Sequence, residues 1–166
     1  MISALFGSSE IAYNIFEAFR GGEGGHVYGA VLATAHRLCG SDTFTIYPYQ
    51  LGEGNDDALD SGAWWFYQKL GFRPRNAATA RLMRREQSAM AKRPHHRSTI
   101  PTLRRLAREN LYYQLGRPRA DVIGELPLGR VGEAVTDAVA KRFGSDRCRA
   151  RRVLTQETRA ARPALA

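Results

Sequence analysis

The chain has 166 residues, enough for one domain with a buried core, or for a small domain with an appendage. Its hydrophobic content of 43% is ordinary for a globular protein, whereas a formal net charge of +9 is not. No apolar run approaches the length of a membrane span, so we expect no membrane-embedded segment.

The charge is divided unevenly along the chain. Residues 1–70 hold 3 Lys+Arg and 8 Asp+Glu, while residues 71–166 hold 22 and 8. This asymmetry indicates an acidic globular part and a basic part that meets a polyanion or an acidic partner. A solvated, arginine-rich helix surface is the simpler alternative.

The two cysteines, Cys39 and Cys148, are far apart and lack metal-ligand spacing. We expect free thiols of a reducing compartment. The apolar start at residues 2–6 has no basic flank and no cleavage site, so it is not a secretory signal. The expected location is the cytoplasm.

The acidic half alternates strand and helix signals. Residues 2–6 suggest a first strand, and residues 10–19, with period-two alternation, suggest a second. A helix is predicted over residues 26–38, ended by Gly40, and a strand over residues 43–47. Strand, helix and strand in this order predict a crossover with two parallel strands.

A glycine cluster connects the second predicted strand to the helix. Backbone N–H groups at such a connection can converge on a phosphate, and glycine permits the close approach. The candidates for phosphate contact are Arg20, Gly21, Gly22, Gly24 and Gly25. Glu23 lies among them and would repel a pyrophosphate unless its side chain turned away. A flexible connection without a ligand is the alternative.

The loop over residues 50–60 carries four acidic residues. It could hold an amine substrate or a cation, although it lacks the order of a calcium loop, and a solvated loop is the favoured interpretation. With Tyr49, Gln50 and Asn55, it follows the strand at 43–47. These side chains should therefore gather at the carboxyl edge of the sheet, where open sheets bind ligands.

An aromatic helix is predicted over residues 61–70, with cap signals at both ends. Ala63, Phe66, Tyr67 and Leu70 share the face expected to be buried, and Trp64 shares the other face with Gln68. Tyr67 would carry its hydroxyl at the edge of an apolar patch, where a phenol can donate or accept a proton. Packing alone is the alternative role for these aromatic residues.

The string from Phe66 to Phe72, preceded by Ala63, resembles the Ala-x-x-(Phe)-Tyr-x-Lys-x-Gly-Phe signature of the GNAT-like acyl-CoA N-acyltransferases. The resemblance covers at most residues 2–74. The family often has Asn seven residues before the Tyr, whereas this chain has Asp60 there and Asn55 further back.

The resemblance implies binding of acetyl-CoA or another acyl-CoA, and acyl transfer to an amine acceptor. It implies that Tyr67 protonates the departing thiolate and that the turn from Arg20 to Gly25 contacts the pyrophosphate. Asn55 and Asp60 are candidate cofactor-binding residues, because they lie at or near the position of the family's asparagine. Glu17 or Glu23 could deprotonate the amine, directly or through water.

The basic half is predicted to be helical. Helices are expected from Asn76 to about residue 92, from Ser98 or Thr99 to Gly116, over residues 129–143, and from Ser145 with fraying beyond about residue 158. This departs from the resembled family, which usually continues after Gly-Phe with a strand. His95 and His96 are adjacent, so they do not form a zinc site.

Two groups of arginines in this half could follow a phosphate backbone. No helix-turn-helix or RNA-binding motif accompanies them. They are Arg104, Arg105 and Arg108 on one helix, and Arg147, Arg149, Arg151 and Arg152 on the last.

The expected fold class is α/β (α+β), with a small mixed sheet of about three strands, flanking helices and a helical C-terminal extension. The expected regions are an acyl-CoA-binding part at 1–75, a helical extension at 76–144 and a basic tail at 145–166. So small a sheet would leave an edge and an apolar face open. An N-terminally shortened domain, a second copy or a partner completing the sheet would resolve this.

A non-catalytic relative and a nucleic-acid-binding module are the alternative functions.

Overall fold

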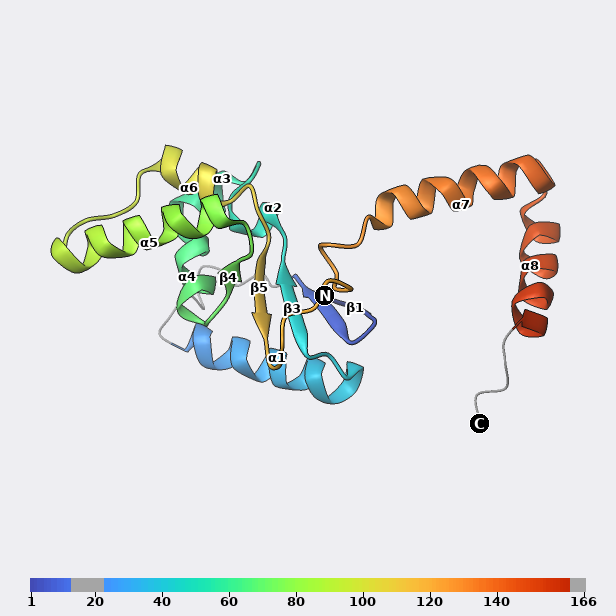
Figure 1. Ribbon diagram of the computed structural model, residues 1–166, viewed down its shortest axis with the longest axis horizontal. Coiled ribbons are helices and arrows are strands. Elements are labelled where there is room, and N and C mark those ends of the chain that lie inside the picture. The colour runs from blue at the N-terminus through green and yellow to red at the C-terminus, as the bar shows by residue number, and fades with distance from the viewer. Residues whose placement is uncertain (13–22, 162–166) are drawn as a thin grey trace. The chain divides into compact units, whose positions relative to one another are not determined.

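A computed structural model of the chain describes residues 1–12 and 23–161. Within that part, the chain divides into two compact units, Met1–Leu126 and Pro127–Ala166. The first is a mixed α+β unit and the second contains two helices (Figure 1). This division joins residues 76–126 to the sheet, whereas the sequence had suggested boundaries after residues 75 and 144. The elements are β1 (Ile2–Leu5), β2 (Ser8–Ile11), α1 (Gly24–Cys39), β3 (Thr43–Ile46), α2 (Pro48–Leu51), α3 (Asp56–Asp60), α4 (Ala63–Lys69), β4 (Arg73–Pro74), α5 (Ala77–Lys92), α6 (Ile100–Leu106), β5 (Leu111–Gln114), α7 (Leu128–Phe143) and α8 (Arg147–Ala161).

The sheet has the strand order β1-β2-β3-β5-β4. β2 and β3 are parallel, in a register that places Glu10 beside Thr45, and the other three pairs are antiparallel. The predicted strand–helix–strand unit with two parallel strands is thereby confirmed, with α1 as its helix. Gly40 ends α1 in a left-handed conformation, φ 63°, as its sequence position suggested.

Five strands replace the three expected. Residues 111–114 were predicted to continue a helix to Gly116, but α6 ends at Leu106 and these residues form β5. β5 pairs with β3 on one side and with β4 on the other, so both edges of its backbone are hydrogen-bonded. β4 directly follows Gly71 and Phe72, so a two-residue strand lies between the aromatic helix and α5.

The second strand begins earlier than predicted. Ser8 and Ser9 were expected to lie between the first two strands, yet both lie in β2 and are fully buried. Their hydroxyls are hydrogen-bonded, Ser9 to Ser41 at 2.5 Å and Ser8 to the backbone N–H of Ile123 at 2.7 Å. Burial therefore costs little. Most of the predicted strand 10–19 lies outside the described residues.

The apolar face of the sheet forms the core with the aromatic helix α4 and with α1. Strand alternation and register place Ile11, Phe44, Ile46 and Leu111 on this face, and each is almost completely buried. The aromatic rings packed in the same cluster are those of Tyr28, Trp64, Tyr67 and Phe72.

The opposite face is polar and is crossed by residues 122–124. Thr45 donates its hydroxyl to the carbonyl of Ile123 at 2.6 Å. Gly124 follows with φ 98°, and a Cβ there would lie 2.8 Å from Thr45 Cγ2, so the approach requires glycine. Val122 and Ile123 are buried. Residues 122–124 thus cover the polar face. The expectation of an open apolar face is wrong, because α1 and α4 pack against that face.

Helix α4 is buried on more sides than predicted. Trp64 and Gln68 were placed on an exposed face, yet they are only 0% and 7% exposed. The indole N–H of Trp64 donates to the carbonyl of Leu106 at 3.1 Å, which fixes α6 against α4. The loop predicted at 50–60 is also more ordered than expected, because it contains the end of α2 and all of α3.

The basic half contains the remaining predicted helices. Asn76 caps α5 as predicted, accepting hydrogen bonds from the N–H groups of Ala78 and Thr79. Glu86, buried on α5, accepts hydrogen bonds from Ser98 at 2.9 Å and pairs with His96 at 3.2 Å. α7 and α8 match the last two predicted helices, although α8 continues past residue 158 to Ala161.

We expect Trp64→Ala to lower the free energy of unfolding by about 3–5 kcal/mol, because it empties a fully buried site and leaves the Leu106 carbonyl without its donor. Urea denaturation at neutral pH measures this loss. Trp65→Ala is the matched control, since Trp65 is only half-buried and its indole N–H donates to Ser98 at 3.1 Å. Equal losses for the two variants would contradict the central role of Trp64.

Candidate functional site

The two parallel strands separate at their carboxyl ends. Within the described residues, their ladder ends at the pair Glu10 and Thr45, although β2 continues to Ile11 and β3 to Ile46. Beyond the ladder, the carbonyl of Ile11 accepts a hydrogen bond from Gln50 Nε2 at 3.0 Å. A side chain of α2 thus occupies the place where β3 would otherwise pair. This is the edge at which the sequence suggested a ligand site.

The Tyr67 hydroxyl reaches the same place from α4. It donates to Gln50 Oε1 at 3.4 Å, near the outer limit for a hydrogen bond. Its ring packs edge-on against Tyr28, Phe66 and Phe72, with centroid separations of 5.5, 5.3 and 5.9 Å. Tyr67 is 4% exposed. The amide of Gln50 therefore links the Tyr67 phenol to the last residue of β2.

Glu10 lies beside this edge, on the polar face of the sheet. Burial raises the pKa of its carboxyl above the ordinary value, although the Met1 amino group opposes the rise. Burial, and then the Glu10 charge, raise the pKa of Tyr47 at the end of β3. Glu10 was not among the candidates predicted from the sequence, because its place beside this edge depends on the pairing of β2 with β3.

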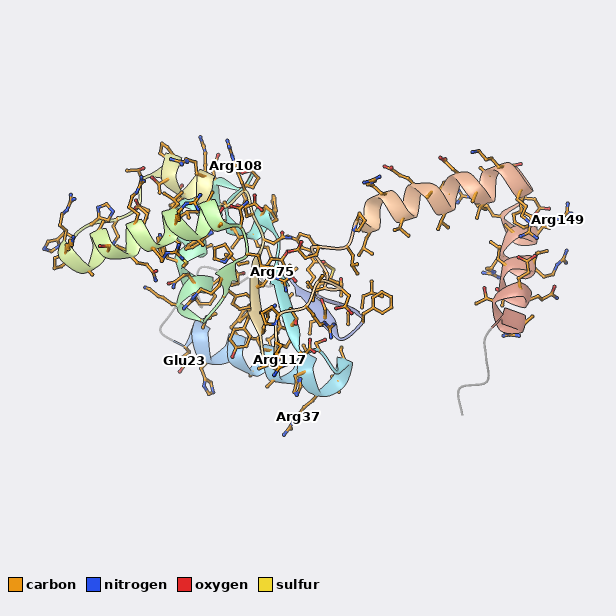
Figure 2. All side chains as sticks on the ribbon, in the orientation of Figure 1. Glu23, Arg37, Arg75, Arg108, Arg117 and Arg149 are labelled. Atoms are coloured by element: carbon orange, nitrogen blue, oxygen red, sulfur yellow. The ribbon has the colours of Figure 1, made fainter. Side chains whose placement is uncertain are left out.

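The glycine turn is described only in part. Glu17, Arg20, Gly21 and Gly22 lie outside the described residues. Glu23 directly precedes α1, and its exposed side chain makes no capping hydrogen bond (Figure 2). Gly24 and Gly25 form the first turn of α1. That helix therefore begins with two residues that have no side chain.

Asn55 and Asp60 were the candidates for the asparagine position of the resembled family, and they lie at the two ends of α3. Asn55 caps α3, because its Oδ1 accepts from the N–H of Ala58 at 3.2 Å, and its Nδ2 donates to the carbonyl of Tyr49 at 3.2 Å. Asp60 ends α3 and is exposed. Asp56, another acid of this segment, pairs with Arg104 at 3.2 Å. Within the described residues, no group of His, Cys, Asp and Glu could hold a metal ion.

A groove of about 400 Å³ lies on the polar side of the β4–β5 edge. Its cationic side chains already have partners. Arg75 lies 3.5 Å from Glu125 and stacks over the Tyr112 ring at 4.3 Å, and Arg119 pairs with Asp42 at 3.0 Å. These contacts give the arginines a structural role in attaching residues 117–126 to the sheet.

Comparison with family models, curated proteins and solved structures yields no match. Among the described residues, none of the helices has the length and apolar character needed to cross a bilayer. Cys39 and Cys148 are both free, as predicted, and both are exposed.

From the raised pKa of the Glu10 carboxyl we predict how the free energy of unfolding depends on pH. Between the ordinary carboxyl pKa and the raised folded value, the folded state binds more protons, so stability falls as pH rises through that range. Glu10→Gln should therefore raise the free energy of unfolding at neutral pH, and the gain should vanish below about pH 4. Chemical denaturation across this pH range provides the measurement. Exposed Glu53→Gln is the control and should change little; a Glu10→Gln variant that loses stability at neutral pH would contradict the assignment.

Proposed function

We propose that this protein binds an acyl-CoA thioester where β2 and β3 separate and transfers its acyl group to an amine. The observation that carries the proposal is the Ile11–Gln50–Tyr67 connection at the end of the parallel ladder. It brings a strand end and a phenol together at one edge of the sheet, close to where α1 begins after the glycine-rich turn. Carboxyl edges of this kind are common ligand sites in open sheets.

The cofactor's phosphates would lie against the start of α1. The helix dipole and the first N–H groups favour an anion there, and the glycine residues allow its oxygens to approach the backbone. Arg20 would supply a cation from the preceding turn. Because the Glu23 side chain is exposed and forms no capping hydrogen bond, its carboxylate can turn away from the phosphates.

Acyl transfer needs a base for the amine and an acid for the thiolate. The deprotonated amine attacks the thioester carbonyl, the C–S bond breaks, and the Tyr67 hydroxyl gives its proton to the departing sulfur. Of the carboxylates considered, Glu10 suits the base role best, because its raised pKa brings it closer to neutrality. Glu17 and Glu23 remain alternative bases. Backbone N–H groups of a strand would polarise the carbonyl.

A non-catalytic acyl-CoA-binding protein is the second candidate. The observation that favours it is the burial of Tyr67, whose hydroxyl already has Gln50 as a hydrogen-bond partner and would need to leave it to reach a thiolate. A measurement of acetyl-CoA binding tests the ligand for both candidate functions, and a measurement of turnover separates the two functions. For either function, the exposed free thiols fit a reducing compartment, and we place the protein in the cytoplasm.

Acetyl-CoA should bind the full chain with measurable heat and raise its melting temperature. The double variant Arg20→Ala with Gly24→Asp should lose both effects, because it removes a cation and adds a carboxylate beside the phosphates. Arg37→Ala with Gly29→Asp is the matched control, since it makes the same charge change further along α1, where Gly29 has open space around it. Absence of binding up to millimolar acetyl-CoA would remove the cofactor assignment.

Tyr67→Phe should lower turnover by about a hundredfold or more with little change in acetyl-CoA binding, the usual scale for a lost proton donor. Release of free CoA in the presence of a panel of amines measures turnover. Tyr113→Phe is the control, because this ring packs beside Phe72 at 5.6 Å without joining the Gln50 connection. Unchanged turnover in Tyr67→Phe would reduce Tyr67 to packing, and binding without turnover in the unsubstituted chain would favour the non-catalytic candidate.

A further inference from the structure

The second unit is a pair of helices joined by a short turn. α7 ends at Phe143 and α8 begins at Arg147, so three residues, 144–146, connect them. Gly144 has φ 58°, and the Asp146 carboxylate accepts a hydrogen bond from the N–H of Arg149 at 2.9 Å. Figure 1 shows α8 turning away sharply from the direction of α7. Two helices joined in this way by a three-residue turn with Gly form a helix-turn-helix arrangement, which the sequence motifs had not indicated.

One face of α8 is used to hold this hairpin together. Ala150 is buried, and Val153 and Leu154 are half-buried. Glu157, the only acidic residue of α8, binds both terminal nitrogens of the Arg142 guanidinium from α7. The only negative charge of α8 thus pairs with its partner helix, and helical spacing places Ala150, Val153 and Leu154 on the same side as Glu157.

The opposite face of α8 is cationic. Spacings of four, three and four residues align Cys148, Arg152, Thr155 and Arg159 along one exposed stripe. Arg149 and Arg151 flank the stripe on either side, and Arg149 projects from the first turn of the helix (Figure 2). Within residues 127–161, none of the α8 arginines is paired with a carboxylate. They are Arg147, Arg149, Arg151, Arg152 and Arg159.

We propose that α8 binds double-stranded DNA, with this stripe in the major groove and the flanking arginines on the phosphates. This inference is independent of the acyl-transfer function. The major groove is about 12 Å wide and admits an α-helix. Helix-turn-helix proteins place their second helix there, and α8 is about 22 Å long, enough to follow the groove.

The chemistry of the stripe favours DNA over other anionic partners. A membrane-surface helix inserts large apolar side chains beside its basic ones, but Val153 and Leu154 lie on the side of α8 that carries Glu157, opposite the stripe. Protein interfaces depend on aromatic or apolar anchors, and this stripe carries none. Double-stranded RNA has a major groove too deep and narrow for side chains to read.

Fluorescence anisotropy of the full chain with a labelled duplex of about 20 base pairs tests the proposal. Binding should weaken by about a hundredfold or more between about 50 and 200 mM salt, the scale for four or five phosphate contacts. Arg152→Glu with Arg159→Glu should abolish measurable binding. Arg130→Glu with Lys141→Glu makes the same charge change on exposed positions of α7 and should keep most of it. Circular dichroism would verify that both variants are folded.

Two kinds of result would contradict the proposal, one against the role of α8 and one against the DNA groove. No binding at about 50 mM salt, or equal losses for the two charge-reversed variants, would overturn the assignment to α8. Equal or tighter binding to double-stranded RNA, to vesicles containing phosphatidylserine or to polyglutamate would overturn the assignment to the DNA groove.

Cys148 gives a second, local measurement. Because it lies four residues before Arg152 on the stripe, bound DNA should slow its reaction with a maleimide by about tenfold or more, in proportion to the bound fraction. Exposed Cys39, on α1, is the internal control and should react at the same rate with and without DNA. Unchanged labelling of Cys148 at saturating DNA would contradict the proposed contact.

Discussion

The first unit depends on the placement of β5 between β3 and β4. This strand forms backbone hydrogen bonds on both sides, and so joins the chain after α6 to the middle of the sheet. Leu111 enters the core, while Tyr112 lies on the polar face under Arg75. Because α6 immediately precedes β5, the strand also holds the Leu106 carbonyl where Trp64 can donate to it. Sheet pairing thereby fixes the helix on which the candidate acid lies.

The two faces of the sheet divide the chemistry of the candidate site. Tyr67 approaches the end of β2 from the apolar side, through Gln50, whereas Glu10 lies on the polar side. A donor in an aromatic environment and a carboxylate with a raised pKa are thus placed on opposite sides of one strand end.

The two units differ in how they use arginine. In the first, Arg75, Arg104 and Arg119 pair with carboxylates and join neighbouring segments. Among the described residues of the second unit, Arg142 pairs with Glu157, and the arginines of α8 face solvent. Arginines that pair with carboxylates join segments of the fold, whereas exposed arginines outside such pairs, in either unit, can offer a surface to a polyanion.

The sequence by itself determined the local elements, because their signals lie within a few residues. Asn76 capping α5, Gly40 ending α1 and the aromatic run of α4 each act on their own backbone. Only the tertiary structure decided that residues 111–114 are a strand, since a short apolar run fits a helix or a strand and its two partner strands are distant in sequence. The same holds for Gln50 and Glu10: their roles depend on where β2 and β3 separate, and that point is set by long-range pairing rather than by any local pattern.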